Sequence, residues 1–495
     1  MSIRLTILNS GKADIIETEP GDTLLKILRD NGYSVYAPCG GRGVCGKCTV
    51  NVRGKGKIRS CTFYPDRDAE VILPETGEAV ILTSQSLYLE EMPFEKIIKQ
   101  PFTTKPFGVA VDIGTTTVVM YFLDMLNGKT VKTSSFLNPQ RTFGADVITR
   151  IEYCQKNRDG LRELQTSLIK EINKYLDDFT EGMDCSHENI EIMAFAGNTT
   201  MLHILLGEDP VPIALAPFTP KFTDKQIRRA INTRLSINPD GSVITLPCVS
   251  AYVGSDIVAG LSALKDSHTN YLYVDIGTNG EIALVNKDRI FMCSTAAGPA
   301  FEGSNISCGM AAVSGAISAY PGFGRYEVIG NNEPAGICGS GILDIVAYLL
   351  VNDLIDETGL MKEPFIVYPE NDIKIIQDDI REIQLAKSAI YSGIRVLMNL
   401  AGLTFNDVEA LFLAGGFGNY IRTDSALLTG LLPGELKDRI YPVGNSAGFG
   451  VLQYLRSEHF GEKINRILKK TSYIELSGLD EFTTEFALNM DFRTG

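Results

Sequence analysis

The pentapeptide Val-Asp-Ile-Gly-Thr occurs twice in this chain, at residues 111–115 and again at residues 274–278. Each copy lies between two apolar runs, a pattern that predicts a strand, a tight turn and a second strand. An internal repeat of this kind indicates two lobes descended from one structural unit. We therefore expect a first lobe over residues 107–268 and a second lobe over residues 269–495.

Both turns carry the chemistry of a phosphate-binding loop. Glycine and threonine present backbone N–H groups and hydroxyls to phosphate oxygens, and an aspartate holds Mg²⁺ directly or through water. One copy alone is equally well explained as a good hairpin turn, whereas two copies facing each other would hold a nucleotide's phosphates from both sides. The predicted catalytic carboxylates are Asp112 and Asp275. The predicted nucleotide-binding residues of the two loops are Gly114, Thr115, Thr116, Thr117, Gly277, Thr278, Asn279 and Gly280.

A third glycine-rich turn follows an apolar strand over residues 411–419. Its glycines, which would let the backbone approach a nucleoside closely, are Gly415, Gly416 and Gly418. In third position after two phosphate loops, this turn resembles the adenosine motif of the superfamily that contains actin, heat-shock cognate ATPases and sugar and acetate kinases. The resemblance covers residues 107–495 and implies a two-lobed α/β ATPase domain that binds ATP and Mg²⁺.

Other loops are less informative on their own. The run at 195–201 follows a short strand and opens a predicted helix, so its amides would suit an anion. Further glycine-rich loops, at 297–303 and 336–341, are expected in the cleft. Glu302 and Asp344 would serve either catalysis or loop and capping contacts, and the sequence leaves both roles open. The four histidines show no ligand spacing, which favours structural or exposed positions.

Four cysteines near the N-terminus form a second constellation. Cys39, Cys45 and Cys48 lie in one glycine-rich loop, and Cys61 follows after twelve intervening residues. The spacing is one residue longer in its first gap than the plant-type ferredoxin spacing for a 2Fe-2S cluster. Because glycine accepts positive φ and close approach of backbone to a ligand, the loop can fold around such a cluster.

Four thiolates also suit zinc. Zinc sites usually pair two short C-x2-C knuckles, however, and this run has three cysteines in one loop with a single distant partner. The cluster is therefore preferred over zinc or disulfides. Cys308 and Cys338 lie in glycine-rich loops, which is a weak sign of proximity to a site. The cysteines without metal-ligand spacing, expected to be small buried side chains, are Cys154, Cys185, Cys248, Cys293, Cys308 and Cys338.

Residues 1–85 are predicted to form one small domain. A strand pair, a short helix, the cysteine loop and a further strand follow one another, an order that resembles the β-grasp ferredoxin fold. Residues 86–106 contain several prolines among polar residues and are predicted to be a linker. A flexible tether and a rigid docked connection are both compatible with this segment.

Charge and hydropathy narrow the partners and the compartment. The 495-residue chain has a formal net charge of −14, which argues against nucleic acid and an anionic membrane as partners. No apolar run approaches the roughly 18 residues that span a bilayer, and the N-terminus lacks the apolar core of a signal peptide. We therefore expect a cytoplasmic protein.

A ferredoxin module joined to an actin-like ATPase is a narrow combination, and the whole chain resembles the reductive activators of corrinoid-dependent enzymes. The resemblance implies that the four cysteines hold a 2Fe-2S cluster, which gives one electron to an inactive cob(II)amide on a partner corrinoid protein. The resulting cob(I)amide is the nucleophile of methyl transfer in anaerobic metabolism, and ATP binding or hydrolysis assists the step. A separate electron donor and homodimerisation through the ATPase part are also implied.

Two rival functions stay open. The first is an ATP-gated activator of acyl-CoA dehydratase type, a class that uses a four-iron cluster at a dimer interface; the ferredoxin-like cysteine loop argues against it. The second is an electron carrier or binding module without ATP turnover. In contrast to some relatives of the corrinoid activators, this chain has no C-terminal cysteine array, which argues against a second electron relay.

Overall fold

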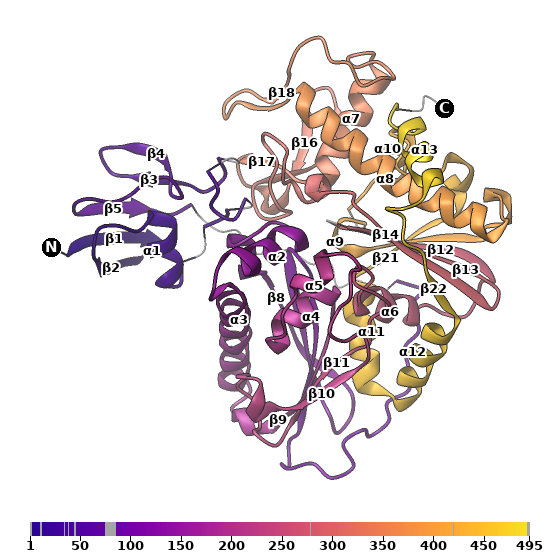
Figure 1. The fold of residues 1–495 in the computed structure, drawn as a ribbon, viewed down its shortest axis with the longest axis horizontal. Helices are drawn as coiled ribbons and strands as arrows, with labels where there is room; N and C mark the ends of the chain where they lie inside the picture. Colours follow the sequence, from indigo (N-terminus) through magenta and orange to yellow (C-terminus); the bar gives the residue numbers. More distant parts are fainter. Residues whose placement is uncertain are drawn as a thin grey trace.

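The structure is a computed structural model that describes residues 2–9, 12–33, 35–37, 39–43, 46–74, 86–277, 279–418 and 420–492. Two of the predicted site residues, Cys45 and Thr278, lie outside the described residues. Three regions follow one another along the chain: a small N-terminal domain, a first lobe and a second lobe (Figure 1). Each is built on its own sheet with accompanying helices, so the protein is a multi-domain α/β structure, as predicted.

The N-terminal domain is one five-stranded sheet packed against the helix α1 (Leu24–Asp30). Its strands, in the spatial order β2, β1, β5, β3, β4, are Lys12–Thr18, Ile3–Asn9, Ala69–Ile72, Thr49–Val52 and Gly56–Arg59. The strand β1 pairs antiparallel with β2 and parallel with β5. Alternate residues of β1, among them Leu5 and Ile7, are fully buried against the apolar face of α1. This is the β-grasp arrangement that the order of sequence elements predicted.

The first lobe contains a six-stranded sheet covered by helices on both faces. Its strands, in the spatial order β10, β11, β9, β6, β7, β8, are Gln226–Arg229, Ser242–Thr245, Ile190–Gly197, Phe107–Ile113, Thr117–Asp124 and Thr130–Leu137. Its helices α2 to α6 are Val147–Lys156, Gly160–Gly182, Thr199–Leu206, Val211–Ala214 and Ser255–Ser262. Val109 and Val111 of β6 pack in the core beneath α3 and α4, whereas Ala110 faces the core of α6. Because both faces are covered, this strand is a continuous apolar run instead of an alternating one.

The second lobe repeats the central part of this plan. Its main sheet, in the spatial order β21, β20, β12, β13, β14, β22, is formed by Ile440–Gly444, Ala410–Ala414, Asn270–Ile276, Gly280–Asn286, Arg289–Thr295 and Thr471–Tyr473. In each lobe the strand before the repeated loop, β6 or β12, pairs antiparallel with the next strand and parallel with a later one. The internal repeat is therefore a structural repeat, as the pentapeptide predicted.

Further elements extend the second lobe. The small sheets are formed by β15 to β17 (Ala316–Gly322, Arg325–Val328, Gly336–Ile337) and by β18 and β19 (Phe365–Tyr368, Ile373–Ile375). The helices α7 to α13 are Gly339–Val351, Gln377–Ala401, Gly415–Gly418, Thr423–Leu428, Ser446–Arg456, Glu458–Lys470 and Asp480–Leu488.

The two lobes share a core between their sheets. Residues of α6 from the first lobe and of α11 and α12 from the second belong to one buried apolar cluster with strands of both sheets, and the three helices lie together at the junction (Figure 1). A Cβ atom at Gly450 of α11 would lie 2.2 Å from the carbonyl oxygen of Ala259 in α6. The two helices are thus in backbone contact at this crossing.

The predicted linker is docked along both lobes. Tyr88 accepts a backbone hydrogen bond from Lys265 at 2.9 Å, and Glu95 donates one to Arg456 at 2.8 Å. The backbone N–H of Thr103 then donates to the Glu191 carboxylate in the first lobe at 2.8 Å. Of the two alternatives that the sequence left open, the docked connection is the one observed for residues 86–106.

Candidate functional site

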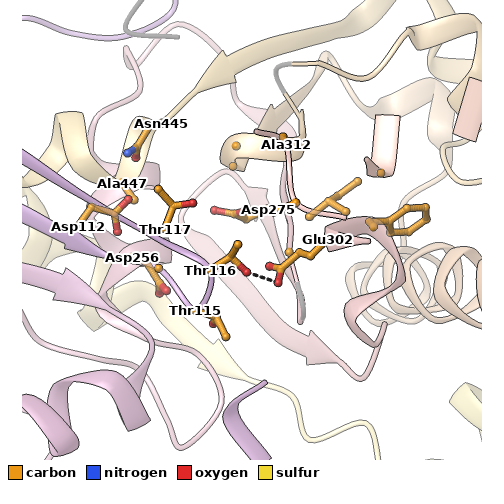
Figure 2. Close-up of a pocket in the computed structure, with 18 of the residues that line it drawn as sticks. Asp112, Thr115, Thr116, Thr117, Asp256, Asp275, Glu302, Ala312, Asn445 and Ala447 are labelled. Carbon is orange, nitrogen blue, oxygen red and sulfur yellow. Dashed lines mark hydrogen bonds between the residues drawn. The ribbon is translucent and has the colours of Figure 1, made fainter. Parts of the chain in front are cut away.

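A cavity of about 230 Å³ lies between the two lobes. Figure 2 shows the side chains of Asp112 and Thr117 on one side of it, and Thr116 pointing toward Glu302 of the other lobe. The predicted residues that line the cavity are Asp112, Gly114, Thr115, Thr116, Thr117, Asp275, Gly277, Asn279, Gly415 and Gly416. Fold and packing thus bring the two repeated loops and the third glycine turn to one place.

Two predicted glycines lie outside this lining and serve packing. A Cβ atom at Gly280 would lie 2.6 Å from Thr295 Oγ1 and 2.8 Å from the Ile390 side chain. At Gly418 it would lie 3.0 Å from the Leu413 side chain. These two residues let neighbouring elements approach one another beneath the cavity.

The first loop is a tight hairpin between β6 and β7. The N–H of Gly114 donates to the Thr117 carbonyl at 3.0 Å, and a Cβ atom at Gly114 would lie 2.6 Å from that oxygen. Asn138 braces the loop from below, because its side chain donates to the Gly114 carbonyl at 2.9 Å and its N–H to the Thr116 carbonyl at 2.8 Å. The backbone carbonyls are thereby occupied, which leaves hydroxyls and N–H groups as the loop's donors toward the cavity.

Arg150 gives the first loop a second brace. Its guanidinium donates to the carbonyl oxygens of Thr115 and Gly144 and to the side chain of Gln140. The residue is fully buried, and burial lowers its pKa to about 9. A buried cation held by carbonyls also places positive charge behind the loop, which favours an anion in front of it.

The third glycine turn is shaped by a carboxylate. Gly415 has a φ of +87°, and a Cβ atom there would lie 2.3 Å from Asp275 Oδ1. Only glycine avoids both the left-handed strain and the collision. Nothing lies within 4 Å of a Cβ built on the neighbouring Gly416, so this part of the turn is open toward the cavity.

Buried carboxylates gather around the cavity. Burial, reinforced by the Asp256 charge, raises the pKa of Asp112 to about 7, and burial with neighbouring carboxylates raises that of Asp275 to about 8. Burial likewise raises the pKa of Asp256 to about 6 and that of Glu281 well above its ordinary value. These buried carboxylates repel one another when they are ionised. A bound cation would be stabilised among them, because it relieves the repulsion and replaces the lost hydration.

The carboxylates fit Mg²⁺ bound together with phosphates. No group of three His, Cys, Asp or Glu side chains in the described ranges is close enough to hold a metal ion without other ligands. Mg²⁺ usually keeps several waters and takes one or two carboxylates plus substrate phosphates. Asp112 and Asp275, one from each lobe, supply such carboxylates on the lining of the cavity.

A side-chain hydrogen bond between Thr116 and Glu302 crosses the cavity from lobe to lobe. Thr116 Oγ1 donates to Glu302 Oε2 (Figure 2). The sequence left Glu302 between catalysis and a loop contact, and its position on the lining is compatible with both. Asp344 lies elsewhere, where it accepts from Ser425 Oγ at 2.6 Å and from the Tyr320 N–H at 3.1 Å. Its role is therefore a buried structural contact.

Asn198 is a donor that faces the site. Its side-chain oxygen caps α4 by accepting from the Thr200 N–H at 3.0 Å. Its Nδ2 is buried and has no hydrogen-bond partner, and the residue lines the cavity. A buried unpaired donor costs about 1–3 kcal/mol, so a ligand oxygen at this position would be stabilised. The anion preference predicted for the 195–201 run thus has a specific atom behind it.

Sequence reasoning missed five of the polar residues that line the cavity. They are Asp256, Glu281, Tyr420, Asn198 as an individual side chain, and Asn445, which donates to Asp112. Glu281 is the one that a signal could have found, because it directly follows the second repeated loop. Asp256 and Asn445 reach the cavity from α6 and from the start of α11, segments with no repeat or motif.

The N-terminal domain buries three of the predicted cluster ligands. Cys39, Cys48 and Cys61 are at most 8% exposed. Burial and a hydrogen bond with Cys48 raise the pKa of Cys61 to about 11, against the opposing effect of a backbone N–H from Gly43. Clustered thiols facing a loop N–H are the ligand type that an iron–sulfur cluster takes. The surrounding glycines with positive φ, as the sequence predicted, are Gly40, Gly41, Gly43 and Gly46.

The other cysteines are free thiols. Cys248, Cys293 and Cys338 are buried, whereas Cys154, Cys185 and Cys308 are half-buried. Cys338 lines the nucleotide cavity at the start of α7. Cys338 therefore lies on the same cavity as the predicted nucleotide-binding loops. Of the histidines, His203 is buried and hydrogen-bonded to the Thr199 carbonyl, and none lines the cavity.

Three family models match successive parts of the chain. Residues 8–73 match a 2Fe-2S iron-sulfur cluster binding domain, residues 107–267 the middle region of RACo, and residues 269–494 the C-terminal, ASKHA domain of RACo. ASKHA denotes the fold of acetate and sugar kinases, heat-shock proteins and actin. Fold and sites therefore define a class: an iron–sulfur ferredoxin domain fused to an actin-like nucleotide-binding domain.

Known proteins match over most of the chain. It is 31% identical to the corrinoid activation enzyme RamQ of Eubacterium limosum, across 93% of this chain and 94% of that protein. It is 24% identical to the Co(II) methylated amine-specific corrinoid protein reductase of Methanosarcina barkeri, across 69% and 68%. The solved structure of a reductive activator for corrinoid, iron-sulfur protein matches with a TM-score of 0.72 and 28% identity, across 99% of this chain and 98% of that one. The chain belongs to this family of reductive corrinoid activators, as the sequence resemblance predicted.

No helix in the described ranges is both long enough and apolar enough to cross a membrane.

Proposed function

We propose that this protein reduces the cobalt of a corrinoid protein in an ATP-dependent reaction. One electron passes from the N-terminal domain to cob(II)amide on the client and gives cob(I)amide, the nucleophile of methyl transfer. A separate low-potential one-electron donor then returns the N-terminal domain to its reduced state. The observation that carries this proposal is the match to a corrinoid activation enzyme over 94% of that protein, which covers both the cysteine domain and the nucleotide lobes.

Each site has a role in this reaction. Cys39, Cys45, Cys48 and Cys61 would hold the 2Fe-2S cluster, which supplies the electron when bound. The hydroxyls of the first loop and the amides of the second would hold the phosphates of ATP from opposite lobes. Asp112 and Asp275 would orient the Mg²⁺ that accompanies those phosphates.

The energetics explain why a nucleotide site is joined to a redox domain. If the cobalt couple lies about 0.2 V below the cluster, transfer of one electron costs about 5 kcal/mol. Typical allosteric coupling between two sites supplies only about 1–3 kcal/mol. We therefore infer that ATP turnover, together with preferential binding of the reduced client, draws the transfer forward.

Anaerobic visible spectroscopy tests the proposal. The cluster-loaded protein is mixed with a cob(II)amide-bearing corrinoid protein and a low-potential reductant, with and without Mg-ATP. We expect the cob(I)amide band to grow only with Mg-ATP, and ATP hydrolysis to accompany it. Normal cluster reduction without any change at cobalt, across a panel of corrinoid clients, would favour the electron-carrier alternative.

The Asp112→Asn/Asp275→Asn double variant provides the matched control. These substitutions keep the side-chain volumes and leave the cysteine domain untouched, so cluster reduction should be normal while cobalt reduction is lost. Cobalt reduction at the parent rate in this variant would contradict the proposed use of ATP. Sedimentation analysis of the same samples tests the homodimer that we also propose.

A further inference from the structure

The N-terminal domain rests on both nucleotide lobes through the side that carries its cysteine loop (Figure 1). Lys47 lies between two of the predicted cluster ligands. Its ammonium donates to three carbonyl oxygens of the second lobe: those of Ile306 at 2.8 Å, Ser307 at 3.0 Å and Gly309 at 3.3 Å. An ammonium has three N–H donors, so this contact can satisfy the whole group.

Tyr36 contacts both lobes at once. The Arg141 guanidinium of the first lobe lies 4.4 Å from the centre of its ring, and its hydroxyl is hydrogen-bonded to Ser304 of the second lobe. Arg42 adds an ion pair to Glu152 of the first lobe at 3.3 Å. Tyr36, Arg42 and Lys47 form the docking face of the N-terminal domain. All of their contacts can be made together only when the two lobes keep their present relative position.

On the second lobe, the docking contacts and the cavity share one compact loop. Glu302 ends the short helix η4 (Pro299–Glu302) on the cavity lining, and Ser304 lies two residues further on. A Cβ atom at Gly303 would lie 2.2 Å from the Met310 carbonyl oxygen, and one at Gly309 would lie 2.2 Å from the Gly303 carbonyl oxygen. Because its neck is closed by backbone contact, this loop is a compact unit that connects Glu302 on the cavity lining with the carbonyls that hold Lys47.

On the first lobe, the docking contacts come from the same segment that holds the first phosphate loop in place. Asn138 and Arg150 hold the backbone of that loop, and Arg141 and Phe143 lie between them in sequence. Gly40 of the cysteine loop packs so closely on Phe143 that a Cβ atom there would lie 2.6 Å from the Phe143 carbonyl oxygen. In each lobe, the residues that face the predicted phosphate site are thus only a few positions in sequence from residues that contact the N-terminal domain.

We infer that nucleotide binding releases the N-terminal domain from the lobes. Phosphates bound at the first loop require the Thr116 hydroxyl, whose proton is donated here to Glu302, and their charge repels that carboxylate. Displacement of Glu302 moves the loop that holds Lys47 and Tyr36, and the docking contacts are lost. This inference rests on the proposed nucleotide site and adds a regulatory step: the cysteine loop becomes accessible to a protein partner once the nucleotide has bound.

Thermodynamic linkage gives the inference a sharp test. If nucleotide binding opposes docking, then docking opposes nucleotide binding by the same factor, so weakening the dock must tighten nucleotide binding. Lys47→Ala removes all three contacts to the second lobe, and Ser304→Ala removes one from the lobe side without changing the cysteine domain. We expect calorimetric titration with Mg-AMPPNP to show tighter binding to Lys47→Ala, by roughly fivefold or more for typical coupling energies.

Controls separate this effect from damage to the cluster or the fold. Lys57→Ala removes the same charge from the exposed face of β4 and should bind the nucleotide as the parent does. The oxidised cluster spectrum should be the same in all samples; if Lys47→Ala loses its cluster, Ser304→Ala decides the test. Small-angle X-ray scattering should show the parent expanding with Mg-AMPPNP to the dimensions that Lys47→Ala has already.

The outcomes distinguish two failures. Equal or weaker nucleotide binding by the cluster-loaded docking variants overturns the inference and leaves the proposed function intact. A parent protein that does not bind Mg-AMPPNP overturns the proposed function, and this inference with it.

Discussion

At the scale of single residues, Gly415 combines a left-handed backbone with a side-chain collision. Alanine at its φ of +87° would cost about 1–2 kcal/mol in backbone strain, and its methyl group would collide with Asp275. We expect Gly415→Ala to lower both the denaturant midpoint and the nucleotide affinity. Gly416→Ala is the control, since nothing lies within 4 Å of its Cβ position; equal losses in both variants would contradict the steric argument.

The buried carboxylates predict a pH dependence. With pKa values raised to about 7 for Asp112 and about 8 for Asp275, the folded protein keeps protons that the unfolded chain has lost. Its stability without metal should therefore fall as the pH rises between about 4 and 8. Urea titrations at several pH values, with a chelator present, measure this dependence of the unfolding free energy on pH. We expect a weaker dependence for Asp112→Asn/Asp275→Asn than for the parent. An unchanged dependence in that variant would refute the raised pKa values of these two carboxylates.

Asn198 tests whether the unpaired donor serves the ligand. Asn198→Ser keeps a side-chain oxygen that caps α4 but removes the buried Nδ2. A hydrogen bond to a charged group contributes about 1.5–3 kcal/mol, so we expect calorimetry to show nucleotide binding weakened by roughly tenfold or more with the melting temperature little changed. Parent-like affinity would assign this residue to helix capping alone.

Some residues of the cavity and of the docking contacts could be predicted from the sequence, and others could not. The loops at 111–117 and 274–280 could be singled out because the same residues occur twice, and a second copy favours a phosphate-binding loop over a simple hairpin turn. Asp256 and Asn445 were missed because long-range packing, which has no local signature, brings them to Asp112. Lys47 was missed for a related reason: its partners are carbonyl oxygens, which every residue has.

At the scale of elements, the two lobes depend on the crossing of α6 and α11. Gly450→Ala would place a methyl group 2.2 Å from the Ala259 carbonyl oxygen, and overpacking of this kind typically costs about 1–3 kcal/mol. Gly461→Ala in α12 meets only ordinary contacts from 3.5 Å and should gain about 0.5–1 kcal/mol from helix propensity. Denaturant unfolding of the two variants measures the change in the free energy of unfolding, which should be negative for Gly450→Ala and positive for Gly461→Ala. Equal destabilisation of both would refute the close helix crossing.

The segment at 86–106 shows another limit of prediction from sequence patterns. Prolines and polar residues at 86–106 predict a segment between domains, yet the same composition fits a flexible tether and a rigid docked connection. What decides is a set of contacts such as that of Thr103 with Glu191, which joins residues 88 apart in sequence. Because this segment is attached to both lobes, its path depends on their relative position.

At the scale of the whole molecule, the contact of Thr116 with Glu302 joins the lobes across the cavity, and a final prediction concerns its charge. Glu302→Gln keeps an acceptor for the threonine hydroxyl but removes a negative charge that opposes phosphates. If Glu302 is displaced on binding, as the docking argument requires, this variant should bind Mg-AMPPNP more tightly than the parent in calorimetry. Asp344→Asn, which alters a carboxylate of the same lobe away from the cavity, should leave the affinity unchanged. Weaker binding by Glu302→Gln would instead make this carboxylate a ligand of the nucleotide's Mg²⁺, and nucleotide entry would then close the lobes around it rather than free the N-terminal domain.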